Sequence, residues 1–205
     1  MSTHIYQEGT IMPEEQQRKF EEYAYVLDHL QFGHPKDTRP LYKREPIVQA
    51  VGEDYFTLLE LVPLPGATFA PRERVTIGKH GREKIDHVKR RIDYEELTQT
   101  AKDELQAVVE EIVSKNEGRF VAFFNHSGPV TTRMHALELL PGIGKKAMWQ
   151  ILEERKKGPF TSFEDIQKRT HIVDPKKMII KRIFMEIKNE DKYYVFCKPP
   201  PKKEF

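Results

Sequence analysis

Apolar residues in the first half of the chain come in short runs that favour β-strands. Each run is rich in β-branched or aromatic residues and is followed by glycine, proline or acidic residues typical of turns. The runs cover residues 23–27, 47–51, 55–62, 74–77 and 85–92. The pattern predicts two hairpins, one joining the second and third strands across Gly52, and one joining the fourth and fifth strands across residues 78–81.

Five strands within roughly seventy residues suit a small closed sheet. We therefore expect a five-stranded OB-like β-barrel over residues 20–92. An SH3-like barrel has the same pattern of runs, and the sequence does not separate the two. Aromatic residues in this half can stack on nucleic-acid bases, although most aromatics in small barrels belong to the core and we expect no more than one or two to be exposed. They are Tyr23, Tyr25, Tyr42, Tyr55 and Phe56.

The second half of the chain has apolar residues at helical spacing instead. Residues 94–115 predict a long helix that bridges the two halves, because their apolar positions recur three and four residues apart. Residues 131–140 and 145–156 are also compatible with helices. Residues 120–124 fit either a strand or the end of a helix, and residues 193–198 predict a C-terminal strand that folds back onto the barrel.

The turn between residues 140 and 145 is the most informative segment of the chain. A proline and Gly142 end one helix, and Gly144 restarts the chain before the next. Glycines on both sides of Ile143 allow a tight turn with no side chain to block its outer surface. Backbone N–H groups at the positive end of the second helix can then bind a phosphate, and Lys145 and Lys146 lie beside them.

This segment resembles the helix-hairpin-helix motif, in which an apolar helix end precedes glycine, an apolar residue, glycine and, three residues later, alanine. The matching positions are Leu140, Gly142, Ile143, Gly144 and Ala147. The resemblance implies a grip on the DNA or RNA backbone that does not read base sequence. The alternative is an ordinary turn between two helices with a glycine at the C-cap.

The residues after 157 have the outline of a second, degenerate hairpin. Ser162 is expected to cap a short helix over 163–169, and Asp174 with Pro175 is expected to begin another helix. The turn over 170–173 contains no glycine, so we expect it to pack against the first hairpin rather than to bind phosphate. Basic residues here either extend a basic surface or form an ordinary solvated face: Lys176, Lys177, Lys181, Arg182 and Lys188.

These patterns predict an α+β chain, made of the small OB-like barrel and an all-α tandem helix-hairpin-helix domain. Its 205 residues are enough for two compact domains. The expected boundaries are a flexible N-terminus over 1–19, the barrel over 20–92, a bridging helix and linker over 93–130, the tandem helix-hairpin-helix over 131–190, and a C-terminal strand and tail over 191–205.

Net charge says little about the ligand, because 34 basic and 32 acidic residues leave a formal charge of only +2. The distribution is more informative, since residues 72–91 are mainly basic and residues 93–117 mainly acidic. We expect the basic segment to form a ribbon that contacts a second stretch of phosphate backbone, which would raise the avidity of two weak sites. Its basic residues are Arg72, Arg74, Lys79, Arg82, Lys84, Lys89, Arg90 and Arg91.

Little in the sequence indicates catalysis, a metal or a cofactor. No histidine or cysteine pair has the spacing of metal ligands, and the segment around Lys145 lacks the first glycine and the hydroxyl residue of a phosphate-binding P-loop. The single cysteine excludes an intramolecular disulfide and is typical of a reducing compartment. No signal peptide or transmembrane run is recognisable. We therefore expect a cytoplasmic, non-catalytic protein with no membrane partner.

One catalytic alternative is a DNA glycosylase of the helix-hairpin-helix type. Such enzymes carry a nucleophilic lysine two residues after the second glycine and an aspartate further along the chain. Lys146 matches the first position, and Glu164 with the adjacent Asp165 falls at the second. A lysine attacks the sugar as a nucleophile only when it is desolvated or close to another cation. Those enzymes also have a large helical body with a base-flipping pocket, whereas the first half of this chain favours strands.

The chain as a whole resembles an uncharacterised archaeal family of predicted RNA-binding proteins that combine an OB-type barrel with a helix-hairpin-helix domain. The resemblance rests on the order of barrel, helix and tandem hairpin, followed by the aromatic ending over 193–196. It implies this architecture and a nucleic-acid ligand, with RNA preferred over DNA. The family has no established catalytic activity that the resemblance could imply for this chain, and we expect the ligand to be held mainly through its backbone phosphates. A protein-interaction adaptor in a ribosomal or repair complex is the alternative in a different class.

Overall fold

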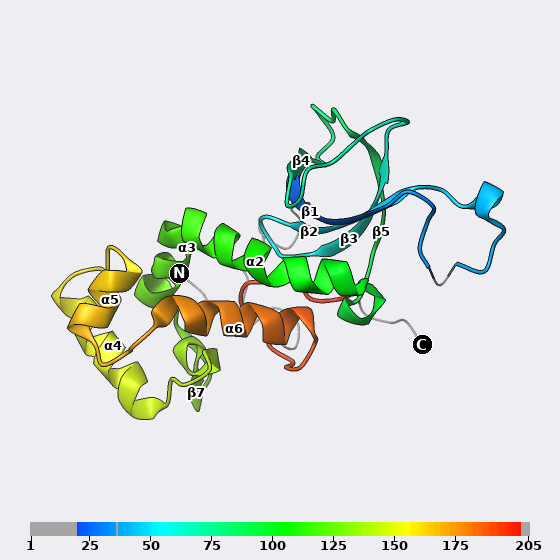
Figure 1. The fold of residues 1–205 in the computed structure, drawn as a ribbon. Helices are drawn as coiled ribbons and strands as arrows, with labels where there is room; N and C mark the ends of the chain where they lie inside the picture. The colour runs from blue at the N-terminus through cyan, green and yellow to red at the C-terminus, as the bar shows by residue number, and fades with distance from the viewer. Residues whose placement is uncertain (1–19, 36, 202–205) are drawn as a thin grey trace. The chain divides into compact units, whose positions relative to one another are not determined.

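The computed structural model describes residues 20–35 and 37–201, which form two compact units (Figure 1). We call the described residues from 20 to 109 the β unit and those from 110 to 201 the helical unit. The flexible N-terminus expected over 1–19 lies outside the described residues. Every helix in the described part of the chain is too short or too polar to cross a membrane.

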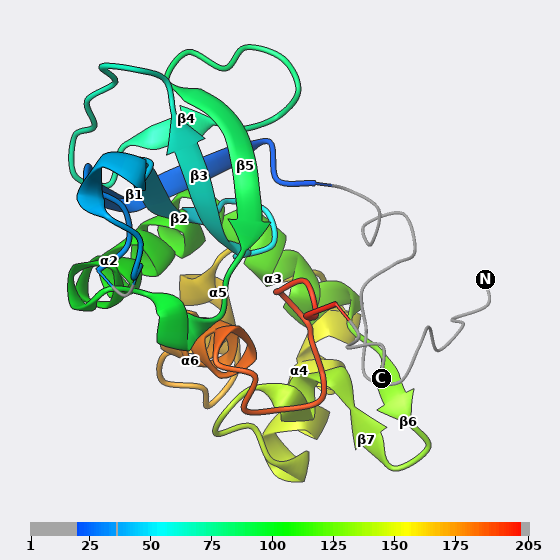
Figure 2. The ribbon, with the colours of Figure 1, turned by 90° about the vertical axis from the view of Figure 1, so that its right-hand side faces the viewer.

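The five strands of the β unit form one curled antiparallel sheet in the order β4-β1-β2-β3-β5 (Figure 2). They are β1 (Tyr23–Leu30), β2 (Ile47–Gly52), β3 (Leu58–Pro63), β4 (Arg74–Thr76) and β5 (Ile85–Arg91). The register shifts once between β1 and β2, and twice between β3 and β5. Such bulges bend a strand and increase its twist, so they contribute to the curl of the sheet.

One of the two predicted hairpins is confirmed, because β2 and β3 pair directly. The other is wrong: β4 pairs with β1 and β5 with β3, so these two strands lie at opposite edges and run in the same direction. Arg82 stabilises an open loop between them. Its Nε donates to the carbonyls of Ile77 and Gly78 at 3.0 and 2.7 Å, and its Nη1 donates to the Asp86 carbonyl at 2.7 Å. The OB-like and SH3-like assignments stay predictions.

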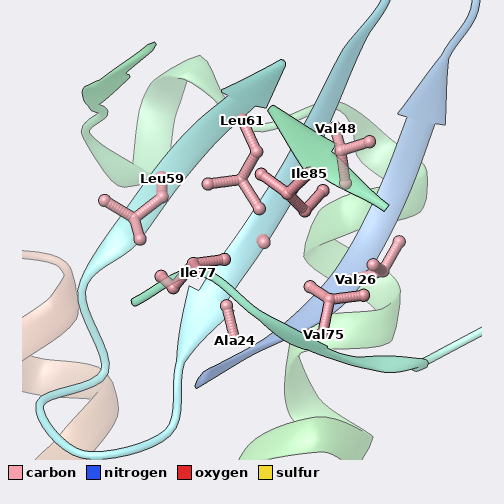
Figure 3. Close-up of a cluster of buried hydrophobic side chains, with 9 residues drawn as sticks. Ala24, Val26, Val48, Leu59, Leu61, Val75, Ile77 and Ile85 are labelled. Carbon is pink, nitrogen blue, oxygen red and sulfur yellow. The ribbon is translucent and has the colours of Figure 1, made fainter. Parts of the chain in front are cut away.

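The core of the β unit lies on one face of this sheet (Figure 3). Every second residue along β1, β2 and β3 points to this face, as expected for strands with one side in a core. Phe69 and Val88 are partly buried against the cluster. Its buried members are Ala24, Val26, Val48, Ala50, Leu59, Leu61, Val75, Ile77 and Ile85.

Gln49, which is fully buried, connects the sheet to the start of α2 (Gln99–Lys115). Its side chain accepts a hydrogen bond from Thr98 N at 2.9 Å and donates one to Glu96 O at 3.0 Å. The Thr98 hydroxyl accepts from Ala101 N at 3.1 Å and so caps the helix. The helix predicted over 94–115 therefore begins only at Gln99, after a short 3-10 turn, η2 (Tyr94–Glu96).

The helical unit continues from the end of α2 with four more helices. These are α3 (Glu117–His126), α4 (Lys145–Lys157), α5 (Phe163–Arg169) and α6 (Pro175–Ile187). Between α3 and α4 lie a two-stranded hairpin of β6 (Pro129–Thr131) and β7 (Met134–His135), and a 3-10 turn, η3 (Ala136–Leu139). Residues 120–124 lie within helix α3, so the strand considered as an alternative for this segment is wrong.

Two predictions for the helical unit are wrong. Residues 131–140 do not form a helix, because the segment over 129–135 pairs as the β6–β7 hairpin and only η3 is helical. Three consecutive β-branched residues, Val130, Thr131 and Thr132, account for this preference. Residues 193–198 do not form a strand, because three of their N–H groups donate to the buried carboxylate of Glu186.

Glu21 closes the β2–β3 hairpin from a position just before β1. The residue is buried, and its carboxylate accepts hydrogen bonds from the backbone N–H groups of Asp54, Tyr55 and Thr57 at 2.9 to 3.1 Å. A Cβ at Gly52 would lie 2.0 Å from the Glu21 carboxyl carbon, so any larger residue here would displace this carboxylate from its hydrogen bonds. Burial raises the pKa of Glu21, because the donated hydrogen bonds offset only part of the lost hydration.

We expect Glu21→Gln to lower the free energy of unfolding by about 1–3 kcal/mol, because the amide has one acceptor oxygen and turns an NH₂ group toward buried donors. Urea unfolding followed by circular dichroism measures the change. Glu22→Gln is the matched control, since the neighbouring glutamate is exposed and its replacement should cost less than about 0.5 kcal/mol. Equal effects of the two substitutions would contradict the role assigned to Glu21.

Candidate nucleic-acid interface

The glycine turn joins η3 to α4 and contains one residue in the left-handed region. Gly142 has a φ of +95°, which L side chains rarely adopt. Ile143 donates its N–H to the Leu140 carbonyl at 3.0 Å and is buried, so its side chain anchors the turn. Gly144 is extended, with a φ of −92° and a ψ of 179°. The first glycine is therefore required by its backbone conformation, whereas the second is not.

Gly144 is the N-cap residue of α4 and leaves the start of this helix uncovered. No side chain caps the helix, and no acidic residue lies in its first turn. Met148 N donates to Gly144 O at 2.9 Å, so the three N–H groups before it have no acceptor within the helix. A Cβ at Gly144 would meet no atom within 4 Å. An anion can therefore approach bare N–H groups at the positive end of α4.

The two following helices begin differently, with side-chain caps at both predicted positions. Ser162 Oγ accepts from Asp165 N at 3.0 Å, and Asp174 Oδ1 accepts from Lys177 N at 2.8 Å. Both helices and both caps are confirmed, and Pro175 lies in the first turn of α6. The Asp174 carboxylate occupies the place that an anion would take at α6 and repels it, so this end is closed to phosphate.

Lys145 and Lys146 lie at the open end of α4, and both are exposed. The Lys145 Nζ is 3.3 Å from the Arg133 carbonyl and 3.7 Å from Glu138 Oε1, and its side chain is 70% exposed. Ion pairs this long and this exposed contribute little. Both ammonium groups are thus accessible to a ligand phosphate.

Arg182, expected either on a basic surface or on an ordinary solvated face, is instead buried beside the glycine turn, with 1% of its surface exposed. Its Nε is 2.7 Å from Glu186 Oε1, and its Nη1 donates to Leu139 O at 3.2 Å and to Asp191 Oδ2 at 2.7 Å. Its Nη2 donates to the Tyr193 carbonyl. Arg182 therefore ties the residue before the turn to α6 and to the C-terminal segment. The neighbouring lysines of α6 remain exposed or half-buried.

A cleft of about 610 Å³ lies beside the glycine turn. Glu138, Met185, Asp191 and Tyr193 contribute to its lining, together with the backbone of the turn. Burial opposes ionisation of Asp191, but the guanidinium of Arg182 lowers its pKa below the ordinary range. Because two carboxylates line this cleft, the surface that attracts phosphate is the lysine side of α4.

His135 holds the first turn of η3, just ahead of the glycine turn. Its ring Nδ1 accepts from Leu137 N at 3.1 Å, and the backbone N–H of His135 donates to Glu138 Oε2 at 2.8 Å. A ring nitrogen that accepts a hydrogen bond must be unprotonated. Burial, together with the charge of Arg155, lowers the pKa of His135 below its usual 6.5.

The basic residues expected to form a ribbon in the β unit are divided between two edges of the sheet, because β4 and β5 do not pair. Most are also ion-paired. The pairs are Arg72–Glu104, Arg74–Glu53, Lys84–Glu73, Lys89–Glu45, and Arg90 with both Glu60 and Glu96, at 2.5 to 3.6 Å. Arg82 holds backbone carbonyls, as described above, Arg91 is half-buried, and Lys79 is exposed. The local positive charge is therefore smaller than the sequence suggests.

The five aromatic residues considered for base stacking are mostly in the core, as expected. Tyr25, Tyr55 and Phe56 are buried, and Tyr42 is 83% exposed. Tyr23 is half-buried, with the Arg74 guanidinium 3.5 Å from its ring centroid. Tyr42 is thus the one member of this group that a base could reach without rearrangement.

The residues that resemble a glycosylase site are exposed or engaged in other contacts. Lys146 is exposed, so burial does not desolvate it as the chemistry of a nucleophilic lysine favours. Glu164 pairs with Lys168 at 2.7 Å, and Asp165 accepts from Thr161 N and pairs with Arg169. Among the described residues, no group of three or more histidine, cysteine or acidic side chains is arranged to hold a metal ion.

Comparison with known proteins places the chain among uncharacterised relatives. A family model described as "Protein of unknown function (DUF655)" matches residues 20–198. Uncharacterized protein MJ0038 of Methanocaldococcus jannaschii is 51% identical over 183 residues, a match that covers 88% of this chain and 82% of that protein. The crystal structure of Af1531 from Archaeoglobus fulgidus is similar, with a TM-score of 0.77, 53% identity, and coverage of 86% of this chain and 99% of that chain.

Removal of the buried guanidinium should destabilise the helical unit. We expect Arg182→Met to lower the free energy of unfolding by about 3–5 kcal/mol, because it leaves the Glu186 carboxylate buried without its cation. Lys181→Met is the matched control, since this neighbour is exposed and should contribute less than about 0.5 kcal/mol. Chemical unfolding of the two variants in parallel tests the difference, and equal stability would exclude the proposed structural role.

Lower pH should destabilise the segment before the glycine turn, because protonation of His135 removes the hydrogen bond that its ring accepts. A group with a lowered folded pKa gives stability that is complete above its unfolded pKa, here about 6.5, and is lost as the pH falls toward the folded pKa. We expect the free energy of unfolding to fall from pH 7 to pH 5, and to fall less in His135→Asn, whose amide oxygen accepts the same hydrogen bond without titrating. Identical pH profiles of the two proteins would contradict this assignment.

Proposed function

The chain belongs to the DUF655 family of uncharacterised archaeal proteins, and we propose that it is a non-catalytic nucleic-acid-binding protein that holds backbone phosphate at the start of α4. The expected resemblance to an uncharacterised archaeal family is confirmed at that level. Its RNA-binding character, its OB-like barrel and its tandem helix-hairpin-helix belong to the proposal. RNA is preferred over DNA through the sequence resemblance alone, because a phosphate grip accepts either backbone.

The observation that carries the proposal is the uncapped N-terminus of α4. Gly144 offers neither a side-chain cap nor a steric barrier, and Lys145 and Lys146 add two exposed charges at the same point. Backbone N–H groups at a helix N-terminus favour a phosphate through hydrogen bonds and the helix dipole together. The buried contacts of Ile143 and Arg182 hold this end in place before any ligand arrives.

The β unit supplies the second contact in this proposal, with a weaker electrostatic basis. Its exposed Lys79 and Tyr42 are accessible to a nucleic-acid strand. Most of its arginines can bind a phosphate only after they break an ion pair with a glutamate. The contribution of these residues should therefore depend steeply on salt and be small beside that of α4. Two such sites on one chain raise the avidity only when a single strand reaches both.

A protein-interaction adaptor is the second candidate, and an apolar surface of the β unit favours it. Phe32, Leu41 and Tyr42, in the connection between β1 and β2, are 71%, 65% and 83% exposed. Apolar side chains in water on one loop are typical of a surface that a protein partner covers. The two candidates differ in salt dependence, because phosphate contacts give a linear relation between log affinity and log salt.

Gly144→Asp should reduce phosphate binding without lowering the stability of the protein. The new carboxylate should cap α4 and leave the free energy of unfolding within a few tenths of a kcal/mol, or raise it. The same carboxylate occupies the anion site, so we expect affinity for nucleic acid to fall about tenfold or more. Fluorescence anisotropy with labelled single- and double-stranded RNA and DNA, at several salt concentrations, measures the loss and identifies the preferred ligand.

Gly144→Asn is the matched control, because it has the same size and caps the helix without a charge; its loss of affinity should be clearly smaller. Lys145→Glu with Lys146→Glu should lower the log–log salt slope by about one for each lysine. Gly142 is a poor position for such a test, since its φ of +95° strains any other residue. Unchanged affinity of the folded Gly144→Asp protein, or no binding to any of the four ligands at low salt, would favour the adaptor.

A further inference from the structure

Trp149 is the only tryptophan of the chain and lies on α4 with 59% of its surface exposed. In the described part of the helical unit, no other aromatic side chain is exposed to this degree. An indole ring is among the largest apolar groups in proteins, and leaving it in water forgoes the stabilisation that burial gives. The tandem-hairpin motif does not account for an aromatic residue here.

The exposure of Trp149 follows from how α4 is fixed in its unit. Met148 and Ile151 bury the opposite face of the helix. The Arg155 Nη1 donates to the carbonyls of Phe124 and Ser127 at 3.2 and 2.9 Å, and the neighbouring Gln150 accepts from His171 N at 3.4 Å. Because these contacts set the rotation of α4, the helix cannot turn Trp149 inward while they hold.

The side of Trp149 toward the start of α4 is cationic. Lys145 and Lys146 precede it by four and three residues, which places both on its face of the helix, and Lys156 follows two turns later. Lys156 pairs with Glu153 at 2.7 Å, so the two lysines at the helix start are the less neutralised cations. A partner for this surface must combine a flat apolar group with negative charge. A nucleotide has both, in its base and its phosphate.

The distance along α4 also suits one nucleotide. Trp149 lies four residues after Lys145, which is a rise of about 6 Å along the helix axis. That is close to the step between neighbouring nucleotides in an extended strand, so a phosphate at the start of α4 leaves the adjoining base near the indole. In a duplex the bases are already stacked on each other and are not available to a side chain.

We propose that Trp149 stacks on an unpaired base of the strand whose phosphate is held at the start of α4, so that the preferred ligand is single-stranded. This inference rests on the proposed phosphate site and specifies its substrate. Stacking on an aromatic ring tolerates any base, because every base has a π-face. Sequence-independent binding of single strands is the expected result.

The single tryptophan allows a direct test in the full-length protein. Titration with a twelve-nucleotide oligo-uridine should quench the intrinsic fluorescence of Trp149, and a twelve-base-pair duplex RNA should leave it nearly unchanged. Anisotropy of the same labelled RNAs gives the affinities. We expect Trp149→Ala to weaken single-strand binding about 5- to 150-fold, and duplex binding less than about twofold.

Two substitutions separate stacking from apolar contact and from misfolding. Trp149→Phe should keep most of the affinity, whereas Trp149→Leu, which is apolar but not aromatic, should behave like Trp149→Ala. Because position 149 is exposed, all three variants should have the circular dichroism and unfolding midpoint of the parent protein. Lys145→Glu with Lys146→Glu should lose affinity for single strands while keeping Trp149.

Each failure has a distinct signature. Stacking would be overturned if Trp149→Ala bound single strands as tightly as the parent protein. If the double lysine variant lost affinity in the same experiment, the phosphate site would still be supported. Equal affinity of the leucine and phenylalanine variants would overturn stacking as well, in favour of simple apolar contact. An absence of binding to both RNAs and to DNA strands and duplexes of the same lengths would overturn both proposals. A fluorescence change that depends on protein concentration alone would instead assign the surface to a second copy of the chain.

Discussion

The buried ion pair between Arg182 and Glu186 is the interaction on which the helical unit depends. Desolvation of two charges costs several kcal/mol for each ion, and the pair persists only because nearly every polar atom of both side chains has a partner. Glu186 accepts from the N–H groups of Val195, Phe196 and Cys197 at 2.8 to 2.9 Å, while Arg182 reaches Leu139, Asp191 and Tyr193. One pair thus joins α6, the C-terminal segment and the residue that precedes the glycine turn.

In the β unit, a second buried carboxylate likewise accepts hydrogen bonds from a group of backbone N–H donors. Glu21 gathers three N–H groups of the β2–β3 turn, as Glu186 gathers three of the C-terminal segment. At the helix starts, Thr98, Ser162 and Asp174 cap α2, α5 and α6, and Glu117 lies in the first turn of α3. Among the described α-helices, α4 alone begins with neither a cap nor an acid. The proposed function assigns a ligand phosphate to this one uncapped and acid-free helix start.

Short sequence motifs predicted the structure correctly at the helix starts and turns that depend on neighbouring residues. Ser162 and the Asp174-Pro175 pair predicted two helix starts, and the glycine turn was evident from three residues. The helix expected over 131–140 failed although the β-branched run over 130–132 was a local signal against it. The other failures lie where a distant partner decides the structure. Nothing near β4 indicates that it pairs with β1 rather than β5, and nothing near residue 195 reveals the carboxylate of Glu186. Arg182 was placed on the surface because helical periodicity locates apolar residues in a core and does not identify a buried cation.

The position of Trp149 on the polar face of α4 was already readable from the helical period, but only the structure shows that no neighbour covers it. This matters for how a chain with a net charge of +2 can bind a polyanion. Most cations of the β unit are already paired, so long-range attraction is weak and a phosphate grip at one helix end has limited affinity. A stacking contact is insensitive to net charge, and its energy is of the same order as that of a charge-assisted hydrogen bond. In the proposed binding mode, an indole one turn from the phosphate site would therefore give specificity for unpaired strands without adding positive charge.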